Sequence, residues 1–339
     1  MTTYSAFKRN ELNANSNGGS ELTTSGLQKV LETSPVSKDL LDKFQFITSR
    51  VRDLNEDKIR VLHLHDLAND PESRHLADVN KRNRFHKLVF SSNWQYQQFR
   101  DVLGVPFDIK STVIETGIDT FKPIFKPKKF DGPIRLIYTS TPHRGLNILC
   151  SVFDQLSKEY PNIELDVYSS FKIYGWDERD KDFEPLYEFC RNHPKINYHS
   201  FQPQEVVREA LVNAHILAYP NTWPETSCRS LIEAMMAGLL CVHPNHAALP
   251  DTAGGMTYMY DYDSNPNVHA NYFYANLKRA VEVVESAQNH LDFVAEYAER
   301  RFSWDYIGPR WVQLVYSLNE QYKEADLSFP KQMFSYRTE

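Results

Sequence analysis

Short, largely apolar runs alternate with amphipathic stretches along most of this 339-residue chain. The runs predict strands of a parallel sheet, because strands buried on both faces read as nearly continuous apolar segments. The stretches between them carry apolar residues three and four positions apart, which is typical of helices. The expected strands are 44–48, 59–64, 87–91, 134–139, 163–168, 196–201, 216–219 and 239–242. Such an alternation predicts an α/β fold.

The same pattern predicts the helices and loops between the strands and indicates where domains begin and end. The expected helices are 21–32, 71–84, 146–160, 272–286, 290–301 and 304–322, while 1–20, 172–182 and 326–339 read as loops or tail. The length favours two domains. Three prolines and four lysines at 120–133 predict an extended hinge. We therefore expect a first domain over 1–125, a linker over 126–133, a second domain over 134–302, a helix over 303–325 and a tail over 326–339.

The stretch Tyr219–His243 organises the second domain. A strand ends at its start, and Pro224 biases the preceding residue away from helix. Thr226 or Ser227 is then the expected N-cap of a helix that ends at Gly238. The next buried strand follows directly. The segment therefore reads as strand, turn, helix and strand.

Two carboxylates, Glu225 and Glu233, bracket the start of this helix. Eight residues at the helical rise would separate them by roughly 12 Å, about the span of a sugar with a diphosphate and a ribose. The helix N-terminus between them suits a diphosphate. This arrangement suggests a cradle for a nucleotide sugar. From the spacing alone, a surface helix with two solvated glutamates is the simpler interpretation.

Charge and composition limit the classes of protein to which this chain could belong. The formal net charge of −6 argues against broad nonspecific affinity for nucleic acid, although a local basic groove stays compatible with it. No apolar run is long enough to span a membrane and no secretory leader opens the sequence, so we expect a cytoplasmic protein. The four cysteines lack paired or metal-binding spacing, which predicts buried free thiols in a reducing compartment.

Other residues carry weaker signals. Gly18-Gly19 before a helix could cradle a phosphate, although most such turns are only turns. His63 and His65 would share one side of a strand at its carboxyl end, where open α/β sheets place ligands. His-x-His can bind metal, but no third ligand stands at a suggestive spacing. Asp261-Tyr262-Asp263 reads as loop aspartates. We expect no metal site and no cofactor.

The segment around Glu225 and Glu233 resembles the donor-site signature P-s-x-x-E-x7-E-A-M-A-x-G-x-P-V of retaining GT-B glycosyltransferases, the glycosyl transferases group one family related to glycogen and sucrose synthases. The resemblance implies that Glu225 binds the transferred sugar and Glu233 the ribose. Thr226, Ser227 and Cys228 replace the family's Gly-Phe-Gly, whose backbone amides approach the donor. The identity of the donor therefore stays open.

Two further matches support the family's architecture. Val113–Asp119 is similar to its V-I-x-N-G-I-D motif, and Phe302-Ser303-Trp304 to its F-S-W start of the last helix. The resemblance implies two Rossmann-like domains that face each other across a cleft, with a C-terminal helix crossing back. The first domain looks trimmed, because no convincing strand precedes Gly18.

The family also implies roles for individual residues. Gly18, Gly19 and Arg144 would lie at the donor phosphates, and His65 beside the reacting sugar, with Asp66 orienting a group nearby. The family's second basic residue is absent, and hydroxyls stand at 139–141 instead. Either these hydroxyls substitute for it, or phosphate is bound more weakly than is usual.

The resemblance therefore implies an enzyme that moves a sugar from a nucleotide-diphosphate sugar to an acceptor hydroxyl, with retention and without metal. Its expected catalytic residues are His65, Arg144 and Glu225; its expected donor-binding residues are Gly18, Gly19, Arg144, Thr226, Ser227, Cys228 and Glu233. The acceptor could be a glycan, a lipid-linked sugar or a modified base of nucleic acid. The basic cluster at 81–87 favours the last, whereas the net charge opposes it. A non-catalytic nucleotide-sugar-binding protein is the alternative outside enzymes.

Overall fold

The computed structural model describes residues 18–120 and 128–330, which form two compact units. The first unit contains Thr23–Gly117 and the chain from Trp304 onward. The second contains Ile118–Ser303 together with the start of the first helix, up to Leu22. Most of the expected N-terminal loop, half of the hinge and the end of the tail lie outside the described residues.

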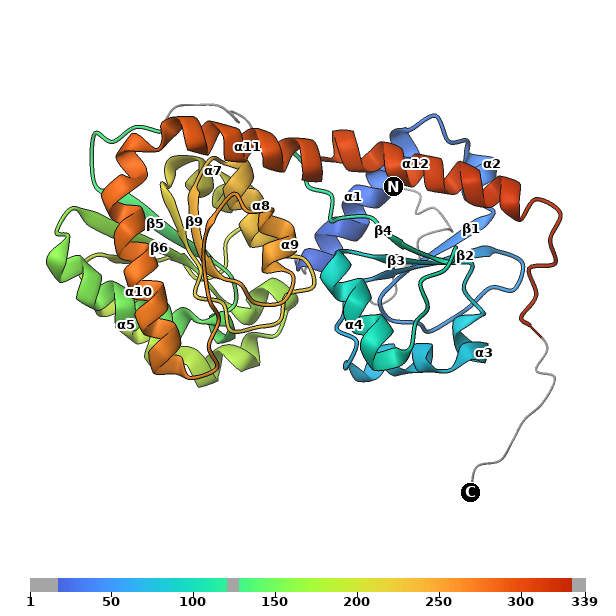
Figure 1. Ribbon diagram of the computed structural model, residues 1–339, viewed down its shortest axis with the longest axis horizontal. Helices are drawn as coiled ribbons and strands as arrows, with labels where there is room; N and C mark the ends of the chain where they lie inside the picture. The colour runs from blue at the N-terminus through green and yellow to red at the C-terminus, as the bar shows by residue number, and fades with distance from the viewer. Residues whose placement is uncertain (1–17, 121–127, 331–339) are drawn as a thin grey trace, which may run out of the picture. The chain divides into compact units, whose positions relative to one another are not determined.

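A four-stranded parallel sheet forms the centre of the first unit (Figure 1). Its order is β1-β2-β3-β4, and Thr48 of β1 pairs with His63 of β2. The strands are β1 (Phe44–Thr48), β2 (Ile59–Leu64), β3 (Lys87–Phe90) and β4 (Ser111–Val113). The helices are α1 (Gly19–Thr33), α2 (Lys38–Leu41), α3 (Val79–Arg82), α4 (Asn93–Leu103), α12 (Trp304–Gln321) and the 3-10 helix η1 (Pro71–Ala77).

Two apolar clusters cover the two faces of this sheet. On one face, Leu27 and Leu31 of α1 pack with Trp311 of α12 over β1 and β2. On the other, Leu76 and Phe99 pack with the alternate residues of β2 and β3. The strands β1, β2 and β3 therefore bury side chains on both faces, which explains why their sequences are largely apolar.

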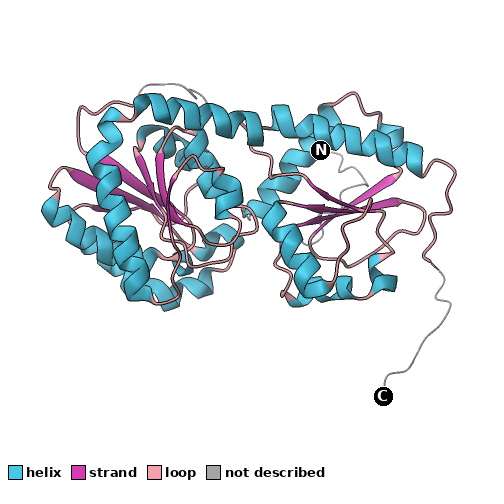
Figure 2. Ribbon diagram, viewed as in Figure 1, coloured by secondary structure: helices cyan, strands magenta, loops and turns pink. Residues whose placement is uncertain are grey.

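The second unit has a six-stranded parallel sheet in the order β10-β9-β8-β5-β6-β7, with helices on both sides (Figure 2). The strands are β5 (Ile134–Thr139), β6 (Ile163–Tyr168), β7 (Ile196–Tyr198), β8 (Ile216–Ala218), β9 (Leu240–Pro244) and β10 (Tyr258–Tyr260). The helices are α5 (Leu146–Glu159), α6 (Glu184–Asn192), α7 (Gln204–Asn213), α8 (Arg229–Met236), α9 (Leu249–Ala253), α10 (Pro266–Val283) and α11 (Gln288–Phe302). The 3-10 helices are η2 (Pro142–Arg144), η3 (Phe171–Tyr174), η4 (Asp177–Phe183) and η5 (Val284–Ser286).

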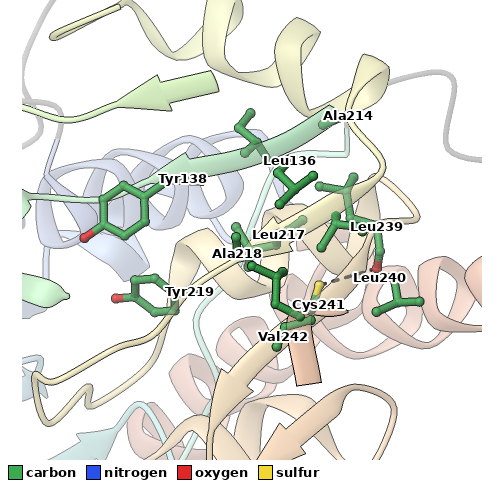
Figure 3. Close-up of a cluster of buried hydrophobic side chains, with 14 of the residues drawn as sticks. Leu136, Tyr138, Ala214, Leu217, Ala218, Tyr219, Leu239, Leu240, Cys241 and Val242 are labelled. Atoms are coloured by element: carbon green, nitrogen blue, oxygen red, sulfur yellow. Dashed lines mark hydrogen bonds between the residues drawn. The ribbon is translucent and has the colours of Figure 1, made fainter. Parts of the chain in front are cut away.

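The direction of winding reverses between β5 and β8. From β5 the chain continues to β6 and β7, whereas from β8 it continues to β9 and β10 on the other side. Below this point Leu136, Leu217 and Cys241 are packed in the core (Figure 3). At the carboxyl ends of the same strands, the hydroxyls of Tyr138 and Tyr219 point to one side (Figure 3). Open α/β sheets bind ligands at such a reversal.

Several local predictions were wrong. Residues 71–84 form η1 and the one-turn α3 rather than a single helix, and 172–182 form η3 and η4 rather than a loop. Neither Thr226 nor Ser227 is the N-cap of α8, which Cys228 provides instead. The Glu225 carbonyl accepts a hydrogen bond from the Ala248 amide, which ties this segment to the next loop outside the helix. The 12 Å estimate, which assumed a helix from Glu225, therefore does not apply.

The expected burial of the cysteines as free thiols is confirmed. All four are buried free thiols, and those of Cys150 and Cys190 lie 3.5 Å apart. Of the other elements, β1, β2, β5 and β6 have the predicted bounds, and Gly238 follows α8 in the left-handed conformation (φ +69°).

Candidate functional site

Two loops of the second unit approach each other at the reversal point. Gly145, after β5, has a φ of +108°, and a Cβ built on it would lie 2.0 Å from the carbonyl oxygen of Pro220, after β8. Only glycine tolerates both this backbone conformation and this contact. Thr222 Oγ1 also donates to the His143 carbonyl across the two loops, at 3.2 Å. These contacts bring Arg144 toward Glu225.

Arg144 and Glu225 form a buried ion pair. Arg144 Nη1 donates to Glu225 Oε1 at 2.7 Å, and the Tyr219 hydroxyl donates to the same oxygen at 2.7 Å. Arg144 Nη2 lies 3.3 Å from the hydroxyl of Tyr174. Glu225 is only 6% exposed. Each residue thus fixes the other's position, and Tyr219 at the end of β8 supports both.

The charge of the guanidinium is stable. Burial lowers the pKa of Arg144, but the charge of Glu225, together with smaller contributions from Tyr174, Tyr219 and Cys228, outweighs burial, so that pKa lies well above its ordinary value. Burial, followed by the charge of Glu225, raises the pKa of Tyr219 well above its ordinary value. Tyr219 is therefore a neutral hydrogen-bond donor.

Three polar groups at the end of β5 and in the loop that follows it are buried without a partner. Within the part of the chain that the structure describes, Thr139 Oγ1, Thr141 Oγ1 and Arg144 Nε have no hydrogen bond. Buried polar atoms are nearly always paired in native proteins, by protein, water or ligand. Two hydroxyls and a guanidinium N–H within six residues make a donor set that fits phosphate oxygens.

Glu233, on α8, lies in a second polar cluster. Its Oε1 accepts from Gln204 Nε2 at 2.8 Å and from Arg229 Nη2 at 3.0 Å, and Arg208 Nη2 lies 3.9 Å away. Glu233 is 5% exposed, and Arg208 also lies 3.9 Å from Asp119. The solvated surface helix considered from the sequence is therefore wrong for Glu233 and for Glu225.

Gly18 and Gly19 lie beside these clusters. A Cβ on Gly18 would meet the ring of Tyr174 at 2.8 Å, and one on Gly19 would lie 3.4 Å from Arg229 Cδ. Gly18 therefore packs against the ring whose hydroxyl contacts Arg144. Cys228, the N-cap of α8, is buried, whereas Thr226 and Ser227 are half-buried.

The segment that carries Tyr174 is held by one carboxylate. Asp180 accepts hydrogen bonds from Ser170 Oγ at 2.5 Å, the Phe171 amide at 2.8 Å and the Tyr187 hydroxyl at 2.7 Å. This anchor explains why the charged segment after β6 is ordered.

His65 lies in the first unit, directly after β2. Its Nε2 is 3.2 Å from His63 Nδ1, and its backbone amide donates to Ser49 Oγ at 2.9 Å. Ser49 adopts a φ of +54°, which is uncommon for a residue with a side chain. Burial raises the pKa of the neighbouring Asp66 carboxyl, and its Oδ2 has no partner among the described residues. A strained residue beside orphaned polar atoms is typical of functional sites.

Within residues 18–120 and 128–330, no three His, Cys, Asp or Glu side chains gather closely enough to hold a metal ion. Asp261 instead accepts from Asn245 Nδ2, and Asp263 from the Asn265 amide. No helix within the same ranges is both long and apolar enough to cross a membrane.

Sequence reasoning missed four contributors. Arg229 stands four residues before Glu233, and the helical i,i+4 rule could have found it. Tyr219 ends a strand at the ligand-binding edge, which was a usable signal. Gln204 and Tyr174 reach the site from segments distant in sequence, and no local pattern marks them.

A protein-family model matches part of this chain. Residues 122–255 match the model of the family Glycosyl transferases group 1. The matched residues lie within the second unit. The match contains Arg144, Glu225 and Glu233. No curated protein matches the sequence to a significant degree.

Solved structures show that the two units together have the GT-B fold, with two Rossmann-like parallel sheets. HepE of Anabaena, in complex with UDP-glucose, is 17% identical, with a TM-score of 0.60 over 77% of this chain and 72% of its own. A glycosyltransferase of Rickettsia africae is 15% identical, with a TM-score of 0.65 over 91% and 84%. Sucrose-phosphate synthase of Thermosynechococcus elongatus is 15% identical, with a TM-score of 0.62 over 87% and 80%.

Proposed function

We propose that this protein is a retaining glycosyltransferase that moves a sugar from a nucleoside-diphosphate sugar to an acceptor hydroxyl without a metal ion. The observation that carries the proposal is the set of orphaned donors, Thr139, Thr141 and Arg144 Nε, beside the buried Arg144–Glu225 pair. HepE, which shares the fold, was crystallised with UDP-glucose, and this supports a nucleotide-sugar donor.

The diphosphate would take the place between the β5 loop and the start of α8. Arg144 Nε and the hydroxyls of Thr139 and Thr141 would donate to its oxygens, each gaining the partner that it lacks. The hydroxyls thus replace the second basic residue that the sequence lacks. Gly18 and Gly19 let the backbone before α1 approach the same place, beside Tyr174 and Arg229.

The two glutamates would hold the remaining parts of the donor. We assign Glu225 to the transferred sugar and Glu233 to the ribose, with Thr226, Ser227 and Cys228 lining the segment between them. Glu233 Oε1 already accepts from Gln204 and Arg229, so these two residues orient the carboxylate for a ribose hydroxyl. The ribose would therefore bind to a carboxylate whose orientation is already fixed.

Catalysis would come from stabilising the departing diphosphate. Its charge grows in the transition state, and fixed cationic groups and hydroxyl donors can offset that charge without a metal. The acceptor would attack on the face from which the diphosphate leaves, which retains the configuration. We further assign His65 to the transfer step, because it follows β2 directly and its amide donates to Ser49, whose backbone conformation is strained.

The test is a panel of nucleotide sugars incubated with the protein, followed by NMR detection of released diphosphate and of free sugar. We expect one donor to bind and to be slowly hydrolysed, with loss of binding in a Thr139→Val, Thr141→Val double variant. Ser151→Ala, a hydroxyl on the exposed side of α5, serves as the control. Binding without turnover, also in the presence of candidate acceptors, would mean a nucleotide-sugar-binding protein. No binding of any donor would refute the proposal.

A further inference from the structure

The loop between α4 and β4 exposes large apolar side chains. Phe107 is 88% exposed and Ile109 is 75% exposed, more than any other large hydrophobic residue among those that the structure describes. Val102, in the last turn of α4, is 54% exposed. Single exposed apolar residues are common on protein surfaces, but several that lie close together mark an interaction site. We call residues 102–110 the apolar loop.

The apolar loop is held in place by the rest of the first unit. Lys87 Nζ, at the start of β3, donates to the Ile109 carbonyl at 2.6 Å. The Phe107 ring contacts Tyr96 of α4, with ring centroids 5.6 Å apart, and Val105 is fully buried. The exposed side chains are therefore presented by a fixed backbone, so that little conformational entropy would be lost when they bind a partner.

Cationic residues adjoin the apolar loop. Lys110 Nζ lies 3.2 Å from Oδ1 of Asn83, the C-cap of α3, and this contact joins the loop to the basic cluster at 81–87. The helices α3 and α4 lie on the same side of the first unit's sheet, opposite α1 and α12 (Figure 1). Residues 78–110 contain six cationic residues and three carboxylates, which are Lys81, Arg82, Arg84, Lys87, Arg100 and Lys110 against Asp78, Asp101 and Asp108. This segment therefore has a positive formal charge, whereas that of the whole chain is −6.

The size and chemistry of this surface argue against two other partners. Even at the ~250 Å² of a large aromatic side chain, three apolar residues cover less than the ~800 Å² per partner of a stable protein interface. Two copies of the chain that met through this surface would also bring their cations together. Nucleic acid would bind the cations, but its charged backbone offers no apolar surface to Ile109 and Val102.

A membrane surface with anionic lipid matches both features. Apolar side chains at the tip of a loop enter the boundary between headgroups and acyl chains, as the apolar face of an interfacial helix does. Each Lys or Arg near the membrane is attracted by the negative potential of the anionic headgroups. We propose that the apolar loop and the basic cluster at 81–87 dock this protein on such a membrane. The inference goes beyond the proposed function and does not depend on it.

Docking through this surface would leave the strand end at His65 accessible. The apolar loop runs directly into β4, which starts at Ser111, and Lys87 is the first residue of β3. The surface therefore lies at the amino ends of these parallel strands. His65 follows the carboxyl end of β2 in the same parallel sheet, which is the opposite edge.

The test is co-sedimentation of the full chain with lipid vesicles, made either of phosphatidylcholine alone or of phosphatidylcholine with one third phosphatidylglycerol. We expect binding to the anionic vesicles, little binding to the neutral ones, and weaker binding at high salt, because salt screens the attraction. Phe107→Ser with Ile109→Ser should lower the partition coefficient at least about tenfold, since these side chains no longer gain from leaving water. Lys81→Gln with Lys110→Gln should lower the partition coefficient by a similar factor.

Phe293→Ser is the matched control, because Phe293 is 57% exposed on α11 of the second unit, and this variant should bind like the parent. No binding of the parent to anionic vesicles, or equal binding of the parent and either double variant, would overturn the inference. Fluorescence anisotropy with a labelled oligonucleotide covers the remaining partner. Binding of the oligonucleotide that is lost in the lysine variant, without binding to vesicles, would make this surface a nucleic-acid site and overturn the inference as well. No nucleotide sugar is used, so failure here is distinct from a failure of the proposed function.

Discussion

Replacing Arg144 by alanine removes the partner of a buried carboxylate. Glu225 would keep only the Tyr219 hydroxyl at its Oε1, in a site where it is 6% exposed. Breaking a buried pair from one side costs about 3–5 kcal/mol, because the remaining charge is uncompensated. The Arg144 side chain is 21% exposed and Tyr219 still donates, so we expect the lower end, about 3 kcal/mol. At roughly 2–4 °C per kcal/mol, Tm should fall by about 6–12 °C.

The assay combines thermal unfolding with donor turnover. Glu225→Gln in the Arg144→Ala background removes the orphaned charge, so the double variant should regain most of the lost Tm. The turnover of this double variant should stay at least ~100-fold below that of the parent protein, the loss typical of removing one transition-state donor. Arg179→Ala is the control, because this arginine packs on the exposed Trp176 at 4.4 Å and should contribute less than about 1 kcal/mol.

Two results would refute this reasoning. If Arg144→Ala has the same Tm as the parent protein, then removing Arg144 does not leave Glu225 as a destabilising buried charge, and the argument from burial is wrong. If Arg144→Ala turns over as fast as Arg179→Ala, the guanidinium does not stabilise the leaving group. The stability arm tests the geometry of the pair, and the rate arm tests its proposed role.

Three further predictions concern single residues. Glu233→Ala should weaken nucleoside-diphosphate binding by roughly 1.5–3 kcal/mol, the value of a charge-assisted hydrogen bond, and unchanged affinity in calorimetry would exclude the ribose assignment. His65→Ala should lower kcat far more than donor affinity; steady-state kinetics equal to those of the parent would leave His65 merely structural. Burial lowers the pKa of His243 to about 4, against 6.5 when unfolded. The unfolded chain therefore binds its proton first as pH falls, and unfolding free energy from His243 should drop by about 2 kcal/mol between pH 8 and pH 5. Urea titrations of parent and His243→Gln should diverge by that amount; parallel pH profiles would count against it.

The strands were predictable because the buried sheet imposes its own sequence pattern. β1 and β2 are buried along nearly their whole length, β5 along most of it, and β6 alternates buried and half-buried residues. Polar residues or a proline stand at the ends of all four, so those ends could be read directly. The start of α8 could not, because a contact distant in sequence decides it. Thr226 and Ser227 favour an N-cap, but the Ala248 amide binds the Glu225 carbonyl and the helix begins at Arg229.

The candidate site, too, has features that the sequence could predict and features that it could not. Glu225, Glu233 and Arg144 could be proposed from the sequence because each stands in a motif at a strand end or on the following helix. Their pairing was not, because the contact between Arg144 and Glu225 depends on Gly145 lying against Pro220, 75 residues further along the chain. Tyr174 was invisible for a similar reason, since its segment is ordered by Asp180 rather than by any apolar pattern.

The most direct test of the account is donor turnover in the presence of EDTA, with the anomeric configuration of the transferred sugar read by NMR. A diphosphate stabilised by Arg144 and by the hydroxyls of Thr139 and Thr141 needs no divalent ion. We predict that the rate is unchanged by EDTA and that the product keeps the configuration of the donor. Loss of turnover that magnesium or manganese restores, or a product of inverted configuration, would contradict the account.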